Sequence, residues 1–180
     1  MKILAVGNSF SDDATMYLPD LLEGAGLRQV VVARLFIGGC SLERHCREYA
    51  ADKASYLYSK TRDNRWDRNL ERKATLRDGL EDEDWDIITI QQSSPLSGLY
   101  ESFVTWTERL VEIIRRHCSN PAAVIVWHET WAYSRNATHP DFPRYGEDQQ
   151  VMYDAIEDCV RRVTADEGLP SSFRPAPPSS

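Results

Sequence analysis

A serine follows the first strand that the sequence predicts, at a position where its hydroxyl could do chemistry. Residues 2–6 form a short apolar run that ends at Gly7, and Ser9 precedes a predicted helix. A hydroxyl placed there lies at the top of a sheet, and the N-terminus of the following helix favours developing negative charge. Catalytic serines need this exposure together with nearby backbone N–H donors. Ser9 is therefore our candidate nucleophile, although a turn or capping serine also fits the position.

Two other segments could supply the donors that hold an oxyanion. Gly38 and Gly39 follow the second predicted strand, where a glycine lets the backbone approach a ligand and offer its N–H. Gln91 and Gln92 follow the third predicted strand, and their side-chain amides are donors of the same kind. A simple turn and ordinary surface or supporting hydrogen bonds are the alternative interpretations of these two segments.

The general base for such a serine would be a histidine, and the chain has four of them. His117 lies near the apolar face of a predicted helix, and His45 lies in another predicted helix without an obvious partner. His128 ends the fourth predicted strand, at the same edge of the sheet as Ser9, and His139 lies in the loop that follows. We therefore name His128 and His139 as the two candidates for the base.

The elements that must position these residues alternate between strands and helices. The predicted strands cover residues 2–6, 30–37, 86–90 and 122–127. The predicted helices cover residues 14–25 with a kink at Pro19, 42–51, 74–80, 103–117 and 147–165, while residues 55–69 form a hairpin or an extended excursion. This alternation predicts an open, mostly parallel sheet with helices on both faces. Ligands bind such sheets at the carboxyl ends of the strands, where all the candidate segments lie.

The composition limits the class of protein. A chain of 180 residues with 42% hydrophobic residues suits one domain with a real core. The net charge of −7 argues against a nucleic-acid-binding surface, and the apolar runs are shorter than the roughly 20 residues that span a membrane. The first residues lack a secretory pattern. We therefore expect a cytoplasmic protein, or a periplasmic or secreted one if an upstream signal was removed.

Four segments, in this order, resemble the sequence blocks of the SGNH (GDSL-like) hydrolases. Residues 7–11, Gly-Asn-Ser-Phe-Ser, resemble the first block, in which the serine of a G-[DN]-S motif is the nucleophile. Residues 37–42 resemble the second block, whose glycine supplies an oxyanion N–H. Residues 85–94, Trp-Asp-Ile-Ile-Thr-Ile-Gln-Gln-Ser-Ser, look like the third-block strand. With residues 130–145 they are similar to a bacterial SGNH-like domain family that carries a W-D-x-[IV]-x-x-Q-Q-x-S motif, over about residues 1–166.

This resemblance implies a flavodoxin-like three-layer α/β/α sandwich that hydrolyses an ester of a small molecule or a carbohydrate. Ser9 would attack the carbonyl carbon, and the N–H groups of Ser9 and Gly39 would hold the oxyanion together with the side-chain amide of Gln92. Gln91 offers the same kind of amide. The resemblance implies no metal and no organic cofactor, and we expect no nucleic-acid or membrane partner.

The chain departs from the SGNH pattern in two places. Residues 91–94 stand where the third block has G-x-N-D, and no D-x-x-H block supplies the base, which leaves His128 and His139. We expect the domain to cover residues 1–168, and a disordered Pro- and Ser-rich tail over 169–180 to replace the last strand. A truncated or frame-shifted reading frame, or loss of the final block, would explain this end.

Weak hydrolysis is the activity expected of such a chain, because an unassisted serine hydroxyl is a poor nucleophile. The alternative function is a non-catalytic module that binds a small molecule or carbohydrate on the same scaffold, against the Trp and Tyr residues of the loop over 128–145. A flavodoxin-like binder of flavin or phosphate also suits the fold, but the first loop lacks the Gly- or Ser/Thr-rich run that phosphate needs.

Overall fold

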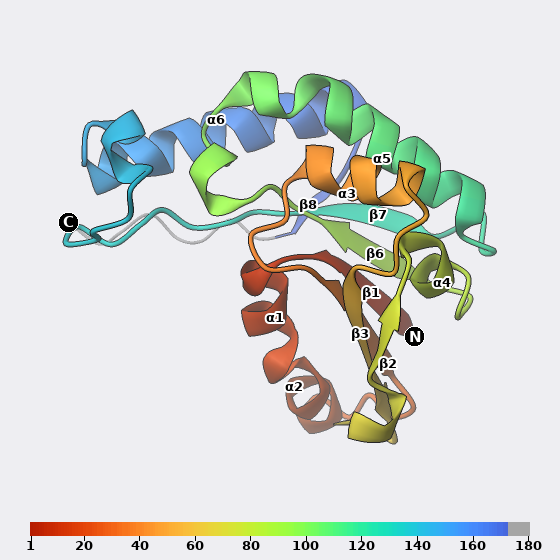
Figure 1. Ribbon diagram of the computed structural model, residues 1–180. Coiled ribbons are helices and arrows are strands. Elements are labelled where there is room, and N and C mark those ends of the chain that lie inside the picture. Colours follow the sequence, from red (N-terminus) through yellow and green to blue (C-terminus); the bar gives the residue numbers. More distant parts are fainter. Residues whose placement is uncertain (173–180) are drawn as a thin grey trace.

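One eight-stranded sheet runs through the molecule, in the order β4-β3-β2-β1-β6-β7-β8, with β5 paired to β3 (Figure 1). The computed structural model describes residues 1–172 and, for Ser171 and Ser172, the backbone alone. The strands are β1 (Lys2–Gly7), β2 (Val31–Phe36), β3 (Tyr56–Arg62), β4 (Arg65–Trp66), β5 (Arg72–Ala74), β6 (Ile87–Ile90), β7 (Val124–His128) and β8 (Ser171–Ser172).

The strands that carry the candidate residues are parallel neighbours. β1 pairs with β2 on one side and with β6 on the other, and β6 pairs with β7. The register sets Val6 beside Ile90, and Ile90 beside Trp127. The carboxyl ends of β1, β2, β6 and β7 therefore meet at one edge, as the sequence predicts. The antiparallel strands β3, β4 and β5 lie beyond β2.

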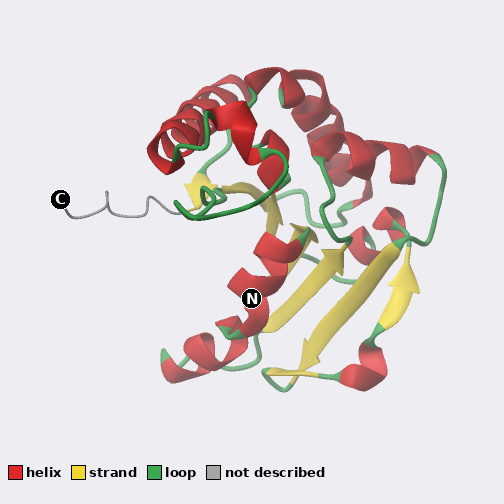
Figure 2. Cartoon of the chain, turned by 60° about the vertical axis from the view of Figure 1, so that its left-hand side comes forward, coloured by secondary structure: helices red, strands yellow, loops and turns green. Residues whose placement is uncertain are grey.

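Helices cover both faces of the sheet, which confirms the three-layer α/β/α architecture (Figure 2). The helices are α1 (Ser9–Met16), α2 (Leu18–Gly24), α3 (Leu42–Ala50), α4 (Leu76–Leu80), α5 (Val104–His117) and α6 (Gln149–Glu167). Strand alternation sends Leu4 and Val6 into the large core beneath α3–α6, while Ile3 joins a smaller cluster against α2.

The first helical segment consists of two helices and not of one kinked helix. α1 ends at Met16 and α2 begins at Leu18, so that Pro19 lies in the first turn of α2. A proline costs little there, because the first N–H groups of a helix have no partner within the helix. The sequence correctly predicts a break near Pro19, but the predicted kink is wrong.

Residues 55–69 form the hairpin that was one of the two expectations for this segment. β3 pairs antiparallel with β4, and Asp63 and Asn64 adopt positive φ angles of 50° and 59° at its turn.

A capping box begins the short helix α4: the Thr75 hydroxyl accepts from the Asp78 N–H, and the Asp78 carboxylate accepts from the Thr75 N–H. These reciprocal bonds explain why so short a helix as α4 begins at Leu76.

The amphipathic helix predicted over residues 103–117 corresponds to α5. It buries Leu110, Ile113 and Ile114 against the core, at the three- and four-residue spacing that the sequence shows. α6 packs beside it and contributes Met152 and Ile156 to the same core. Within residues 1–172, no helix combines the length and the apolar character that crossing a membrane would require.

The expectation that the last strand is missing is corrected by β8. Ser171 and Ser172 pair in parallel with Trp127 and His128, and the Trp127 N–H donates to the carbonyl of Pro170 at 2.9 Å. The chain therefore reaches the outer side of β7, although only two residues pair there. Of the tail predicted over 169–180, residues 173–180 lie outside the described part of the chain.

Candidate active site

Ser9 is the first residue of α1 and its side chain is exposed at the carboxyl end of β1. Its neighbour Asn8 caps the helix, because the Asn8 side-chain oxygen accepts from the Phe10 N–H at 3.1 Å. Phe10 turns into the protein and is 7% exposed. The capped, anchored turn therefore presents the Ser9 hydroxyl outward at a helix N-terminus, as the sequence predicts.

Asn8 joins the loops that follow three strands. It is 1% exposed, and its amide nitrogen donates to the carbonyls of Cys40 at 2.9 Å and Gln92 at 3.4 Å. Its oxygen accepts from Phe10 N–H and from the amide nitrogen of Gln91 at 2.7 Å. A main-chain carbonyl can only accept, so these bonds fix which end of the Asn8 amide carries the hydrogens.

The orientation of Asn8 fixes the tautomer of His128 through Gln91. Because the Gln91 nitrogen donates to Asn8, its oxygen must accept, and it lies 2.6 Å from Nδ1 of His128. Nδ1 therefore carries the proton, and in the neutral imidazole Nε2 keeps the lone pair. Burial lowers the pKa of His128, which favours this neutral form near pH 7. His128 thus has the tautomer that a general base needs.

Gly7 makes the room that this hydrogen-bond chain requires. A Cβ atom at Gly7 would lie 2.9 Å from Cδ of Gln91 and 2.6 Å from Oγ of Ser11. Ser11 is itself buried and donates to the carbonyl of Asn8 at 2.8 Å. The glycine that begins the Gly-Asn-Ser motif is therefore required by close packing under the serine loop.

Two main-chain N–H groups, those of Ser9 and Gly39, lie in loops that Asn8 links through its bond to the Cys40 carbonyl. Ser9 is the first helical residue, whose N–H has no partner within the helix. Gly39 is exposed in the turn after β2 and adopts a φ of 61°, which glycine tolerates at no steric cost. Within residues 1–172 no hydrogen bond is recorded for either N–H. The oxyanion role that the SGNH resemblance implies for these two groups stays a prediction.

The side-chain amide of Gln92 has another role in this structure. Gln92 is 1% exposed, and its nitrogen donates to the carbonyl and the hydroxyl of Ser102 at 3.0 and 3.1 Å. Its oxygen accepts from the N–H groups of Leu42 and Ser93. Both of its N–H donors are thus occupied away from Ser9. Gln92 braces the core, and the oxyanion role predicted for it does not fit this geometry.

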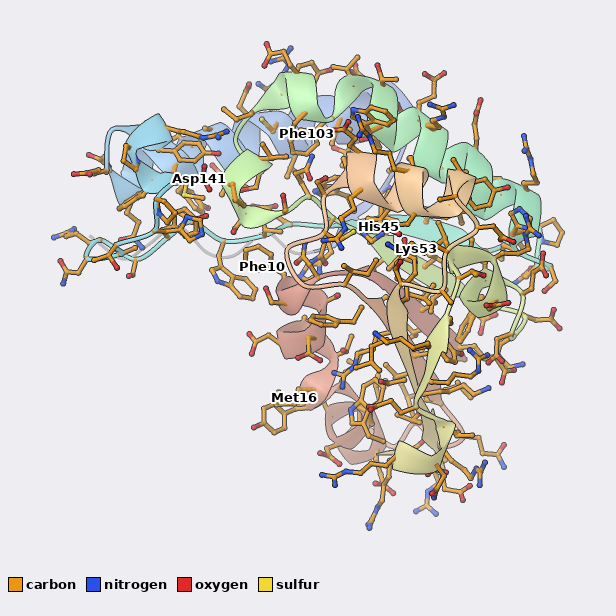
Figure 3. All side chains as sticks on the ribbon, in the orientation of Figure 1. Phe10, Met16, His45, Lys53, Phe103 and Asp141 are labelled. Atoms are coloured by element: carbon orange, nitrogen blue, oxygen red, sulfur yellow. The ribbon has the colours of Figure 1, made fainter. Side chains whose placement is uncertain are left out.

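A cleft of about 1080 Å³ opens beside Ser9, between α1 and the loop that follows β7. Phe10 and Trp131 form one wall, with ring centroids 4.4 Å apart in an edge-to-face contact. Trp131 is 49% exposed, so a large part of its ring is open to a ligand. Figure 3 labels two residues in this part of the molecule: Phe10 at the start of α1, and Asp141 in the segment that follows β7.

The far wall of the cleft carries His139, whose ring stacks on Tyr133 with centroids 4.6 Å apart. The main-chain N–H of Asp141 donates to Nδ1 of His139 at 3.2 Å. A main-chain N–H can only donate, so Nδ1 holds a lone pair and neutral His139 carries its proton on Nε2. The two candidate histidines therefore have opposite tautomers, and His139, unlike His128, lines the cleft with Ser9.

The charge around the cleft is negative. Within residues 1–172, the residues that line the cleft include Asp12 and Asp13 but neither a Lys nor an Arg. Asp12 forms an ion pair with Arg34, while Asp13 is exposed and has no recorded partner within residues 1–172. A cleft of this kind suits a neutral or cationic ligand better than an anionic one. Clusters of three or more side chains fit to bind a metal are absent from residues 1–172.

The other two histidines do not face Ser9. His45 is completely buried, and its Nδ1 lies 2.8 Å from the hydroxyl of Tyr56. His117 bridges the hydroxyl of Tyr49 and the carboxylate of Glu81. Both have structural contacts, as expected for His117 from its helical position.

Sequence reasoning missed the role of Gln91 as the link between Asn8 and His128. A usable signal for Gln91 was the alternation of β6, in which Ile88 and Ile90 face the core. Gln92 continues that face, whereas Gln91 turns toward α1 and the serine loop. The sequence does predict a ligand surface on the Trp and Tyr residues of the 128–145 loop, but only the path of the loop after β7 brings Trp131 against Phe10.

Known proteins resemble this chain over most of its length. Residues 2–169 match the family described as "Domain of unknown function (DUF4886)". A DUF4886 family protein of known structure from Bacteroides uniformis is 39% identical, with a TM-score of 0.87 over 94% of this chain and 64% of that one. The chain thus spans less than two thirds of the length of that relative. The comparison with curated proteins gives no match.

More distant structures share the fold. A proposed SGNH hydrolase from Slackia heliotrinireducens is 20% identical, with a TM-score of 0.57 over 95% of this chain and 77% of that one. The acetyl xylan esterase AlAXEase is 9% identical, with a TM-score of 0.58 over 95% and 76%. At these identities the likeness concerns the fold. The chain belongs to the DUF4886 family and has the fold of the SGNH-like hydrolases.

Proposed function

We propose that this chain is an SGNH-type serine hydrolase that cleaves an ester and uses Ser9 as the nucleophile. The observation that carries the proposal is the exposed Ser9 hydroxyl at the N-terminus of α1, beside an open cleft. The hydrolase-like fold supports the proposal, and the resemblance of residues 7–11 to the first SGNH block implies a nucleophilic serine at this position. Activity and substrate are part of the proposal.

The proposed reaction has two steps. Oγ of Ser9 attacks the carbonyl carbon and loses its proton to a base, while the carbonyl oxygen becomes an oxyanion held by the N–H groups of Ser9 and Gly39. The bond to the alcohol then breaks, the alcohol takes up the proton, and an acyl group stays on Ser9. Water attacks this acyl-enzyme by the same route and releases the acid.

His128 is our proposed base, because its neutral form keeps a lone pair on Nε2. It is linked to the serine loop through Gln91 and Asn8, and the described residues show no hydrogen bond between Ser9 Oγ and an imidazole. His139, the other candidate, shares the cleft but carries its proton on Nε2. We therefore propose slow turnover, because the hydroxyl of Ser9 has no imidazole partner in this arrangement.

We propose a neutral ester as substrate, with an acylated carbohydrate as the favoured class. The exposed ring of Trp131 offers a flat apolar surface beside Ser9, and the unpaired carboxylate of Asp13 disfavours anionic groups. A structural neighbour is an acetyl xylan esterase, which acts on esters of this class. The cleft volume of about 1080 Å³ leaves room for more than one sugar ring.

Labelling with a fluorophosphonate tests the nucleophile directly. We expect the reagent to modify the wild type and the control variant Ser119→Ala, whose serine is exposed at the far end of α5. Ser9→Ala should remain unmodified by intact-mass spectrometry. Labelling of Ser9→Ala, or of none of the three proteins, would exclude Ser9 as the nucleophile.

A binding module on the same cleft is the second candidate function. It is favoured by one observation: the cleft has its aromatic walls, yet the described residues place no imidazole against the Ser9 hydroxyl. Calorimetry with tetra-O-acetyl-xylopyranose distinguishes the two functions. Binding without release of acetate would support the module, whereas release of acetate that Ser9→Ala abolishes would support the hydrolase.

A further inference from the structure

The two ring nitrogens of His139 differ: Nδ1 accepts a hydrogen bond from the protein, whereas Nε2 does not take part in one within residues 1–172. Nδ1 accepts from the Asp141 N–H at 3.2 Å, and one face of the ring stacks on Tyr133. Within residues 1–172, the buried side-chain N and O atoms that lack a partner are His45 Nε2 and Thr107 Oγ1. Nε2 of His139 also lacks a partner within residues 1–172, but it is not one of these two buried atoms. It is therefore open to solvent, on a side chain that lines the cleft beside Ser9.

We propose that His139 is a hydrogen-bond donor to an oxygen of the substrate, through its Nε2–H, and not the general base. The inference rests on the cleft being the substrate site of the proposed function. It assigns to His139 the kind of contact that the SGNH resemblance implies for a side-chain amide, because the amide of Gln92 is bonded to Ser102. The ligand group that it recognises is an acceptor, such as the carbonyl oxygen of an acyl group.

The Nε2–H donor of His139 is present in both the neutral and the protonated ring. The charged and titratable groups around it are Tyr133, Asp141 and Arg144: an Asp141 carboxylate oxygen lies 3.7 Å from Nδ1, and the other oxygen of Asp141 pairs with Arg144 at 3.0 Å. Protonation of the ring would add a proton at Nδ1, next to the Asp141 carboxylate. Nε2–H would remain in place, so the donor survives protonation, whereas a base would be lost by it.

The ring of His139 is held by two contacts that do not involve Nε2, so its donor can be removed with the stacking retained. His139→Phe keeps an aromatic ring against Tyr133 but has no N–H. His139→Gln keeps an N–H donor at a similar distance from Cβ, on a more flexible side chain. The pair thus separates the loss of the donor from the loss of the side chain.

Binding to Ser9→Ala proteins tests the proposal without any need for turnover. The probe is tetra-O-acetyl-xylopyranose, which is neutral and offers acceptors but no donor, and calorimetry gives its Kd. We expect His139→Phe in the Ser9→Ala background to bind about three- to tenfold more weakly, the range for one neutral hydrogen bond. His139→Gln should stay within about threefold of the parent.

The tautomer has its own readout. In protein labelled with ¹⁵N-histidine at pH 7.5, the resonances that disappear in His139→Gln should show a protonated Nε2 and an unprotonated Nδ1. A protonated Nδ1 with an unprotonated Nε2 would overturn the proposal. So would equal binding by His139→Phe and the parent, equal losses in both variants, or no binding of the probe by the parent.

These outcomes are distinct from failure of the proposed function. If Ser9 is labelled but His139→Phe does not change the Kd, the hydrolase proposal stands and the donor proposal fails. If Ser9 is not labelled but the Kd depends on the His139 N–H, the hydrolase proposal fails and the donor proposal stands. If His139→Gln abolished hydrolysis by the otherwise wild-type chain while leaving the Kd unchanged, His139 would be the base.

Discussion

Nδ1 of His128 donates to the side-chain oxygen of Gln91 across 2.6 Å, so a neutral amide stands where a serine triad places a carboxylate. Both groups fix the same tautomer, because both accept from Nδ1–H. The amide, however, does not stabilise the imidazolium that forms when a base takes up a proton. Burial lowers the pKa of His128. This pairing predicts a well-oriented but weak base.

Replacing Asn8 by Asp should destabilise the protein, although the two side chains have the same shape. Asp keeps the acceptor for Phe10 and Gln91 but sets a carboxylate oxygen against the carbonyls of Cys40 and Gln92. We expect the free energy of unfolding to fall by about 2 kcal/mol or more, because buried acceptors would lose their donor.

Urea unfolding at pH 7 measures the effect of Asn8→Asp. The matched control is Asn136→Asp in the exposed loop after β7, which should change the free energy of unfolding by less than about 0.5 kcal/mol. Equal stability of the two variants would contradict the amide orientation on which the His128 tautomer depends.

Gly7→Ala and Gly24→Ala form a pair that separates close packing from helix propensity. A Cβ atom at Gly7 would meet Ser11 and Gln91 at 2.6 and 2.9 Å, whereas nothing lies within 4 Å of one at Gly24. We expect Gly7→Ala to cost about 1–3 kcal/mol and to displace the serine loop. Gly24→Ala, at the end of α2, should be neutral or stabilising by less than about 1 kcal/mol. Thermal unfolding of the pair tests this, and a neutral Gly7→Ala would count against the packing.

Acid should destabilise the fold through His45. Burial lowers the pKa of His45 to about 3 from an ordinary value of 6.5, so the unfolded chain binds a proton there at pH values where the folded chain does not. Stability is therefore full above about pH 6.5 and falls as the pH drops toward 3. The slope from this one group is about 1.4 kcal/mol per pH unit.

The variant His45→Phe isolates that contribution. It removes the titrating group, and the Tyr56 hydroxyl loses its partner at every pH alike. Denaturant unfolding between pH 7 and 5 should show a shallower pH dependence for His45→Phe than for the wild type, whatever their difference at pH 7. Parallel curves would show that His45 takes up its proton equally in both states.

Trp131→Ala should weaken binding of the acetylated xylose by about tenfold, or roughly 1.4 kcal/mol, because the ring supplies the exposed apolar wall beside Ser9. Calorimetry on Ser9→Ala proteins gives the measurement. Val151→Ala, at an exposed apolar side chain on α6, is the control and should leave the Kd unchanged. An unchanged Kd in Trp131→Ala would place the ligand elsewhere.

The sequence predicts the sheet, the helices and the place of Ser9 because these depend on local patterns. Apolar runs such as residues 2–6 are buried in any open α/β sheet, and a glycine after such a run ends the strand. The sequence predicts less well the features that depend on only a few residues. Pro19 lies in the first turn of a helix instead of kinking one, and β8 pairs through only two residues. Neither feature has a periodic pattern long enough to identify it.

For the site, local sequence patterns are enough to predict that a serine, a glycine turn, an amide pair and a histidine follow neighbouring strands. The three-dimensional contacts were needed to show that Gln91 bonds to both Asn8 and His128, and which nitrogen of His128 and of His139 carries the proton. The reason is physical: an amide or imidazole has no fixed role until its partner is fixed, and the partners of Gln91 lie 83 and 37 positions away. A pattern of neighbouring residues carries no information about such distant donors and acceptors.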